Sequence, residues 1–110
     1  MPRFRSFSQY TIEAVSLLGK LIKLGRKKRQ WSEYELAERA GVSRQTVQRM
    51  EKGDPTCSLG LVFEAAALVG VRLFDSDRAT LASHLERTDD VLTLMPKSVH
   101  KTNKAVDDDF

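Results

Sequence analysis

The stretch WSEYELAERAGVSRQTVQRMEKG, residues 31–53, decides the fold of this 110-residue chain. Ser32 followed by Glu35 forms a capping box, in which the two side chains satisfy free backbone donors at the start of a helix. Gly41 suits the left-handed position that ends a helix, and Ser43 offers the next N-cap. The stretch therefore predicts two short helices joined by a tight turn, the second ending near the next glycine.

The second of these helices has two chemically different sides. Val47 and Met50 give it a packing side, which we expect to meet Leu36, Ala37 and Val42. Its other side carries forked donors and amides, namely Arg44, Gln45, Gln48 and Arg49. In the major groove of DNA, arginine can fork onto guanine and glutamine onto adenine. Because a recognition helix enters that groove with its N-terminal half, we expect these four side chains to read base edges.

Further side chains around the stretch are suited to contact DNA phosphates, which fix the position of a protein without reading sequence. We expect such contacts from hydroxyl residues at the helix starts and from basic residues before them. They are Ser32, Tyr34, Ser43, Thr46, Arg26, Lys27 and Lys28. Residues 20–52 hold ten Lys/Arg against four Glu, whereas residues 53–96 hold three against seven Asp/Glu. An affinity for DNA that falls with added salt should follow.

Length and composition limit the class of protein. The chain is long enough for one compact domain, and 41% hydrophobic with 30% charged residues is typical of a soluble globular protein. No apolar run approaches the roughly 20 residues of a membrane span, and no uninterrupted apolar segment follows the basic start. We expect no membrane segment and a cytoplasmic protein, associated with the nucleoid when it is bound to DNA.

The same residues favour a binding protein over an enzyme. The sequence shows no glycine-rich phosphate loop, no nucleophile-base pair and no metal-ligand spacing. The single cysteine, Cys57, allows no internal disulfide. We therefore expect no catalytic residues, no cofactor and no metal.

Helical periodicity continues on both sides of the stretch. Apolar residues at three- and four-residue steps predict a helix from about Thr11 to Lys28, in which Gly19 and Gly25 each cost up to about 1 kcal/mol relative to alanine. After the Asp54 loop, a helix capped by Thr56 or Ser58 and ended by Gly70 follows. We expect its inner face to hold Leu59, Val62, Phe63, Ala66 and Val69.

The C-terminal part is harder to interpret. Asp75 or Asp77 can cap a fifth helix, and the apolar segment VLTLMP, residues 91–96, is either a short strand or a last turn of helix. The prediction is an all-α, compact five-helix domain, with a C-terminal strand for dimerisation as an option. We divide the chain into an N-terminal arm (1–10), a DNA-binding domain (11–74), a dimerisation or partner-binding extension (75–96) and a flexible acidic tail (97–110). Phe110 is either an anchor for a partner or part of a floppy end.

From residue 18 to residue 71 the sequence resembles the Xre, or Cro/CI-type, helix-turn-helix family of bacterial and phage repressors. The matching elements are Arg26, Trp31-Ser32, Leu36-Ala37, Gly41-Val42-Ser43, Val47, Glu51 and Gly53. The resemblance implies an ion pair between Arg26 and Glu51. It also implies a homodimer that binds two half-sites of double-stranded DNA, roughly 34 Å apart.

A narrower resemblance concerns the regulatory role. The segment from Gly41 to Asp75, with the later LMPK segment and the acidic DDDF end, is similar to the HipB-like antitoxins that accompany HipA-like serine/threonine kinases. It implies a repressor of its own operon that holds a kinase toxin inactive. Two alternatives stay open: an Xre-type regulator, phage-like or effector-responsive, without a toxin partner, and a protein-interaction adaptor.

Overall fold

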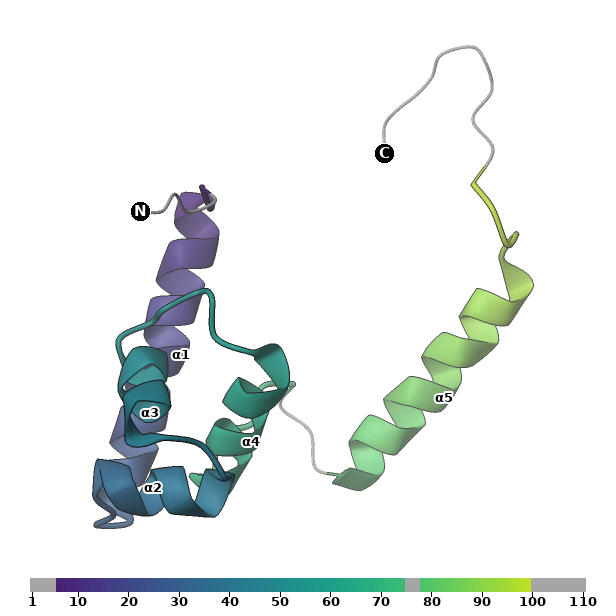
Figure 1. The fold of residues 1–110 in the computed structure, drawn as a ribbon. Helices are drawn as coiled ribbons and strands as arrows, with labels where there is room; N and C mark the ends of the chain where they lie inside the picture. The colour runs from purple at the N-terminus through teal and green to yellow at the C-terminus, as the bar shows by residue number, and fades with distance from the viewer. Residues whose placement is uncertain (1–5, 75–77, 100–110) are drawn as a thin grey trace. The chain divides into compact units, whose positions relative to one another are not determined.

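The regular structure of the chain is entirely helical in the parts that the structure describes. A computed structural model describes residues 6–74 and 78–99 and places five helices in them (Figure 1). They are α1 (Gln9–Lys28), α2 (Glu33–Ala40), α3 (Arg44–Glu51), α4 (Leu59–Leu68) and α5 (Arg78–Leu94). The predicted all-α class with five helices is confirmed. Neither described range contains a strand, and residues 91–94 continue α5, so the optional C-terminal strand is not formed there.

Helix α1 begins two residues before the predicted start. The hydroxyl of Ser8 accepts a hydrogen bond from the backbone N–H of Thr11 at 3.2 Å and acts as the N-cap. A serine at this position satisfies one of the free donors of the first turn, which favours the earlier start. Gln9 and Tyr10 are therefore helical rather than part of an arm. Residues 1–5 lie outside the described residues.

The local signals between α1 and α3 are confirmed. The hydroxyl of Ser32 accepts from the N–H of Glu35 at 3.0 Å, and the carboxylate of Glu35 accepts from the N–H of Ser32 at 2.7 Å. Gly41 ends α2 with φ of +72°, a conformation that glycine adopts without strain. The Ser43 hydroxyl accepts from the N–H of Thr46 at 3.1 Å and caps α3.

The hydrophobic core lies between α1, α2, α3 and α4. Helix α2 packs on α3 and α4, and α1 packs on the same two helices (Figure 1). The buried hydrophobic residues are Ile22, Leu36, Ala37, Val47, Met50, Ala65, Ala66 and Val69, and Val42 packs partly buried against them. The predicted packing side of the stretch is thereby confirmed.

Two glycines of α1 mark the points where other helices come closest. A Cβ atom on Gly19 would lie 2.9 Å from the carbonyl oxygen of Glu51, and one on Gly25 would lie 2.7 Å from that of Val69. Contacts this short leave no room for a side chain. The sequence interpretation treated both glycines only as weak points of α1, whereas the structure uses them for close packing on α3 and α4.

The predicted inner face of α4 needs one correction. Ala66 and Val69 are buried and Val62 and Phe63 are partly buried, but Leu59 is 72% exposed. Leu59 is the first residue of α4, where the chain has not yet reached the core.

The caps of α4 are only partly as predicted. Ser58 occupies the N-cap position without a side-chain hydrogen bond, so the hydroxyl cap expected of Thr56 or Ser58 is not made. Gly70 follows the C-cap with φ of +84°, and the predicted end of the helix is confirmed.

The chain divides into two units, residues 1–75 and residues 76–110. The first unit contains α1 to α4 and the whole core described above. The second contains α5, in which no residue is buried. The core residues described above all lie within the first unit. The predicted caps of α5, Asp75 and Asp77, lie outside the described residues.

Candidate nucleic-acid interface

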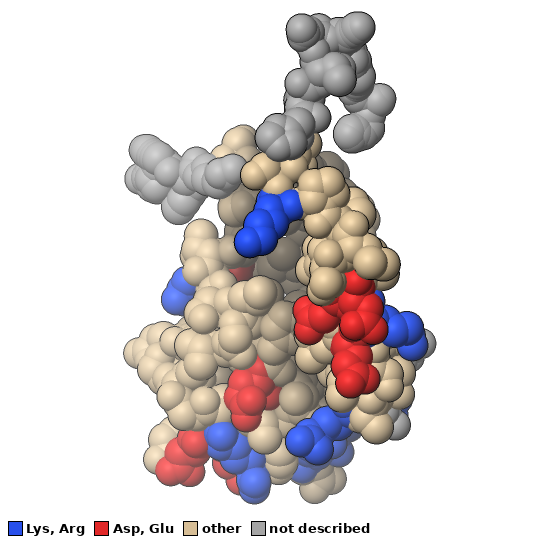
Figure 2. Space-filling model, turned by 90° about the vertical axis from the view of Figure 1, so that its right-hand side faces the viewer, with Lys and Arg blue, Asp and Glu red and all other residues tan. Residues whose placement is uncertain are grey.

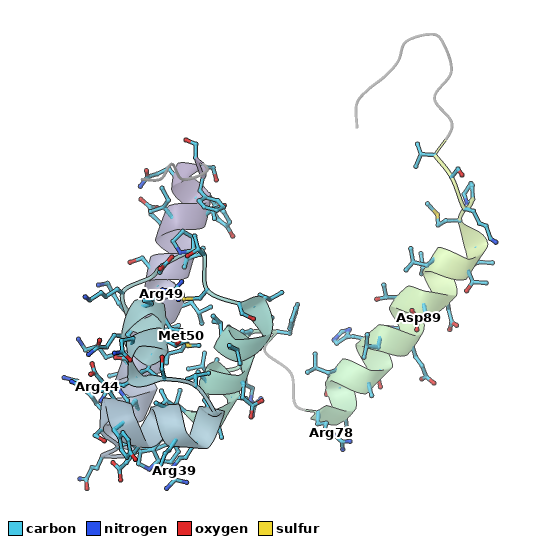
Figure 3. All side chains as sticks on the ribbon, viewed as in Figure 1. Arg39, Arg44, Arg49, Met50, Arg78 and Asp89 are labelled. Carbon is cyan, nitrogen blue, oxygen red and sulfur yellow. The ribbon has the colours of Figure 1, made fainter. Side chains whose placement is uncertain are left out.

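Helix α3 presents opposite sides to the core and to solvent. Val47 is completely buried, Met50 is 3% exposed, and both pack in the core. On the other side Arg44, Gln45 and Arg49 are exposed and Gln48 is partly buried. In Figure 3, Arg44 and Arg49 project from the outer side of the helix, while Met50 points towards the other helices. The four predicted base-reading residues thus lie on one helix that is anchored from behind.

A carboxylate from α2 holds two of these side chains. The Nε of Arg44 and the Nε2 of Gln48 both donate to Oε1 of Glu33, at 3.1 and 3.0 Å. The hydrogen bonds from Gln48 and Arg44 lower the pKa of Glu33 below its ordinary value. Glu33 stays ionised at neutral pH and fixes both side chains from the first turn of α2.

Arg49 is held at the other end of α3 by the loop before α4. Its Nε donates to Oδ2 of Asp54 at 2.9 Å, and a terminal nitrogen donates to the hydroxyl of Thr56 at 3.0 Å. Asp54 also accepts from the hydroxyl and the backbone N–H of Thr56, at 2.6 and 2.8 Å. These hydrogen bonds, those from Thr56 first and that from Arg49 next, lower the pKa of Asp54 to about 2.

A hollow beside the N-terminus of α2 brings several predicted phosphate contacts together. Its lining residues are Lys23, Arg26, Lys27, Ser32, Glu33, Tyr34 and Arg44. Two lysines of α1, the N-cap serine of α2 and the tyrosine in its first turn therefore face the same space as the first residue of α3. Such a group of cations and donors can hold the phosphates of a strand whose bases lie against α3.

The structure contains the ion pair that the resemblance implies, and it is buried. The Nε of Arg26 donates to Oε2 of Glu51 at 2.7 Å, and a terminal nitrogen donates to Oε1 at 3.0 Å. The other terminal nitrogen donates to the carbonyl oxygen of Trp31 at 2.9 Å. The hydrogen bond with Glu51 also raises the pKa of Arg26.

This burial contradicts the phosphate contact predicted for Arg26. The residue is only 6% exposed, and each of its three guanidinium nitrogens already has an acceptor inside the protein. Reaching a phosphate would break a buried bidentate pair, which is a large cost. The positive charge of Arg26 was visible in the sequence, but its burial was not.

A family model described as helix-turn-helix matches residues 22–75, just under half of the chain. Within these residues, α2 and α3 are two short helices joined by the turn at Gly41. The match begins within α1, includes the whole of α2, α3 and α4, and so covers the core and the outer side of α3. This family comprises DNA-binding regulators rather than enzymes, and the match suggests a DNA-binding transcription regulator. No curated protein matches the chain.

Three further predicted phosphate contacts lie within residues 22–75 but do not line the hollow. Ser43 and Thr46 share a hydrogen bond of 3.0 Å between their hydroxyl groups at the start of α3. Lys28 is exposed on the last turn of α1 and does not line the hollow. Phe110 lies outside the described residues.

Sequence reasoning missed Lys23 and Glu33. Lys23 could have been found by helical spacing, because it precedes Lys27 by four residues and so lies on the same side of α1. No local pattern in the sequence indicated that Glu33 contacts the reading side. Its partner Arg44 follows eleven positions later, so only the angle between α2 and α3 brings the two side chains together.

Charge is unevenly distributed on the surface. On the face drawn in Figure 2, lysine and arginine side chains (blue) and acidic side chains (red) both interrupt a mostly uncharged surface. None of the described helices has both the length and the apolar character needed to cross a bilayer. The described ranges also contain no group of three or more His, Cys, Asp or Glu residues suited to a metal ion.

Proposed function

We propose that this chain is a sequence-specific DNA-binding repressor that reads its operator in the major groove with the outer side of α3. The observation that supports this most is the division of α3 into a packed side and a polar side. Val47 and Met50 anchor the helix, so Arg44, Gln45, Gln48 and Arg49 project from a fixed support. Forked donors and amides held in this way match the edges of guanine and adenine.

We further propose that the hollow beside α2 receives the phosphate backbone. Lys23 and Lys27 supply positive charge there, and Ser32 and Tyr34 supply hydroxyl groups. Ser43, Thr46 and Lys28 remain proposed phosphate contacts at the edges of the same surface, whereas Arg26 does not. Neutralised phosphates release counterions, so affinity should fall steeply with added salt.

The proposal can be tested by selecting duplexes from a library with a randomised centre and measuring affinity for the selected sequence. Arg44→Ala should cost about 1–3 kcal/mol of binding free energy and relax the preference at one base pair. Arg72→Ala removes the same charge from an exposed position after α4 and serves as the matched control. If Arg44→Ala and Arg49→Ala leave specific binding unchanged, the reading side is wrongly assigned. Absence of any DNA binding would favour the adaptor alternative.

We propose that the protein acts as a dimer and that a second copy covers α5. Leu81, Leu85, Leu92 and Met95 are separated by four, seven and three residues, which places them along one side of α5 and its end, and all four are exposed. A helix of this length with no packed side is marginal in water, so pairing with another helix would stabilise it. Two copies would also place two recognition helices on half-sites one helical turn apart.

Sedimentation equilibrium tests the dimer. The wild-type chain should sediment as a dimer, and Leu85→Asp should weaken association by placing charges at the shared interface. Glu86→Asp, which alters the neighbouring position without touching the apolar side, is the control. A wild-type protein that remains monomeric at every concentration would contradict the proposal.

The antitoxin role is the most specific part of the proposal. It rests on the similarity of residues 41–75, the LMPK segment and the acidic end to HipB-like antitoxins. Co-expression with the product of the neighbouring gene tests it: we expect a HipA-like kinase that co-purifies with this chain and is inactive in the complex. Phe110→Ala should weaken that complex if Phe110 is an anchor. A neighbouring gene that encodes no kinase would favour an Xre-type regulator without a toxin partner.

A further inference from the structure

Acidic side chains hold three of the four proposed base-reading residues. Glu33 of α2 accepts from Arg44 and Gln48, and Asp54 of the loop after α3 accepts from Arg49. Carboxylates are unfavourable beside a phosphate backbone, because like charges repel. Their presence on the surface that is proposed to bind DNA calls for a physical reason.

We propose that Glu33 is a positioning residue that orients Arg44 and Gln48 for base edges and at the same time weakens binding to DNA of any sequence. This inference rests on the proposed function. Both donors share a single carboxylate oxygen, so the two side chains are fixed relative to each other as well as to α2. A fixed pair loses less conformational freedom when it meets the matching bases.

The hydrogen bonds to Glu33 leave the base-reading groups available. Arg44 uses its Nε, and its two terminal nitrogens have no hydrogen-bond acceptor within the described ranges. They can donate to the O6 and N7 atoms of guanine. Gln48 uses one N–H of its amide and keeps the other N–H and its carbonyl oxygen, the two groups that pair with adenine.

Glu33 also makes binding to a mismatched DNA sequence less favourable. Its side chain is 28% exposed, and DNA lying on α3 would cover it further. If a mismatched base pair pulled Arg44 or Gln48 away, the covered carboxylate would lose a donor, and an unpaired buried charge is strongly unfavourable. Discrimination then comes from penalising the wrong partner as well as from rewarding the right one.

Asp54 and Thr56 form an equivalent support for Arg49. Both residues accept from the guanidinium, while Thr56 donates two hydrogen bonds to Asp54. The loop between α3 and α4 therefore orients the last reading residue, as α2 orients the first. Of the four proposed base-reading residues, Gln45 is the one that no acidic side chain holds in the described residues.

Two substitutions of Glu33 separate positioning from charge. Glu33→Gln removes the charge but keeps an oxygen that accepts hydrogen bonds, and Glu33→Ala removes both. Each variant is measured with the duplex selected by the wild-type protein and with a duplex of mixed sequence, over a series of salt concentrations. Glu64→Gln removes one negative charge from the exposed side of α4 and is the matched control.

Both Glu33 variants should bind the mixed duplex about 3–10-fold more tightly at low salt, with a steeper dependence on salt. The ratio of affinities for selected and mixed duplexes should fall about tenfold or more in Glu33→Ala and less in Glu33→Gln. Asp54→Asn should lower the same ratio through Arg49. Glu64→Gln should leave both the ratio and the salt dependence as in the wild type.

Different results would overturn different parts. If Glu33→Ala binds the mixed duplex more tightly but keeps the wild-type ratio, Glu33 supplies only charge and the positioning role is wrong. Should Glu33→Ala unfold, the ratio measured with Glu33→Gln decides, and an unchanged ratio overturns the inference. A wild-type protein that binds duplexes without preference would instead overturn the proposed function, and the inference with it.

Discussion

The two units of the chain use their apolar residues in opposite ways. Helices α1 to α4 surround eight buried hydrophobic residues, although α2 and α3 have only eight residues each. Helix α5 has 17 residues and buries none. Length therefore does not decide which helices have a packed side. Helices as short as α2 and α3 depend on tertiary packing for their stability, and the first unit supplies this packing internally.

The largest effect should come from the buried ion pair of the first unit. Arg26→Ala leaves the carboxylate of Glu51 buried without its partner, and we expect a loss of about 3–5 kcal/mol in the free energy of unfolding. Urea titration followed by Trp31 fluorescence measures it. Replacing both residues by methionine should cost less than either single substitution, because no buried charge is left unpaired. A loss below 1 kcal/mol for Arg26→Ala would mean that the pair does not stabilise the core.

One substitution made in both units tests their difference directly. Leu36→Ala opens a cavity at a fully buried position and should cost about 2–5 kcal/mol. Leu85 is 66% exposed on α5, so Leu85→Ala should change the unfolding of the first unit by less than about 0.5 kcal/mol. The same urea titration at low protein concentration measures both. Equal losses would show that α5 belongs to the same cooperative unit as the core.

Two glycines of the first unit allow a comparison between a closely packed position and an open one, with smaller expected changes in stability. Gly19→Ala adds a methyl group against the backbone of α3 and should cost about 1–3 kcal/mol. A Cβ on Gly60 meets nothing within 4 Å, so Gly60→Ala should stabilise α4 by up to about 1 kcal/mol. Thermal unfolding of the two variants gives the comparison. Stabilisation by Gly19→Ala would contradict the close approach of α1 and α3.

The smallest effect concerns the loop that holds Arg49. The pKa of Asp54 is lowered from 3.8 to about 2, so the stability that its hydrogen bonds contribute is present above pH 3.8 and is lost as the pH falls towards 2. Carboxyl NMR of an acid titration checks this value. Thr56→Val removes the largest cause of the shift and should raise the pKa of Asp54. Titration of Asp54 near 3.8 in the wild type would show that the loop does not hold Arg49 in solution.

Local signals in the sequence were sufficient for much of the fold. The capping box of Ser32 and Glu35 and the left-handed Gly41 act within a few residues, so they could be recognised without knowledge of the tertiary structure. The exposed position of Leu59 could not, because it depends on where α4 meets the core. Gly19 is a similar case: its close contact with α3 depends on how two helices cross.

The sequence predicted which residues lie on the outer side of α3, but not which other side chains contact them. Spacing along α3 placed Arg44 and Arg49 on the side away from the core, and the structure agrees. The sequence did not show that Glu33 would hold Arg44, because residues eleven positions apart meet only through the turn between α2 and α3. The resemblance implied the pair of Arg26 with Glu51, but the basic run also placed Arg26 among the phosphate contacts, since such a run gives no information on which member faces inward.

Amide NMR of the chain titrated with the selected duplex tests most directly whether the outer side of α3 contacts DNA. We expect the largest shift changes at residues 43–49 and residues 32–34, which form the reading side and the edge of the hollow, with smaller changes in α4. Arg44→Ala should reduce those changes at the same DNA concentration. Changes confined to α4 or α5, or a titration that Arg44→Ala leaves unaltered, would contradict the proposed interface.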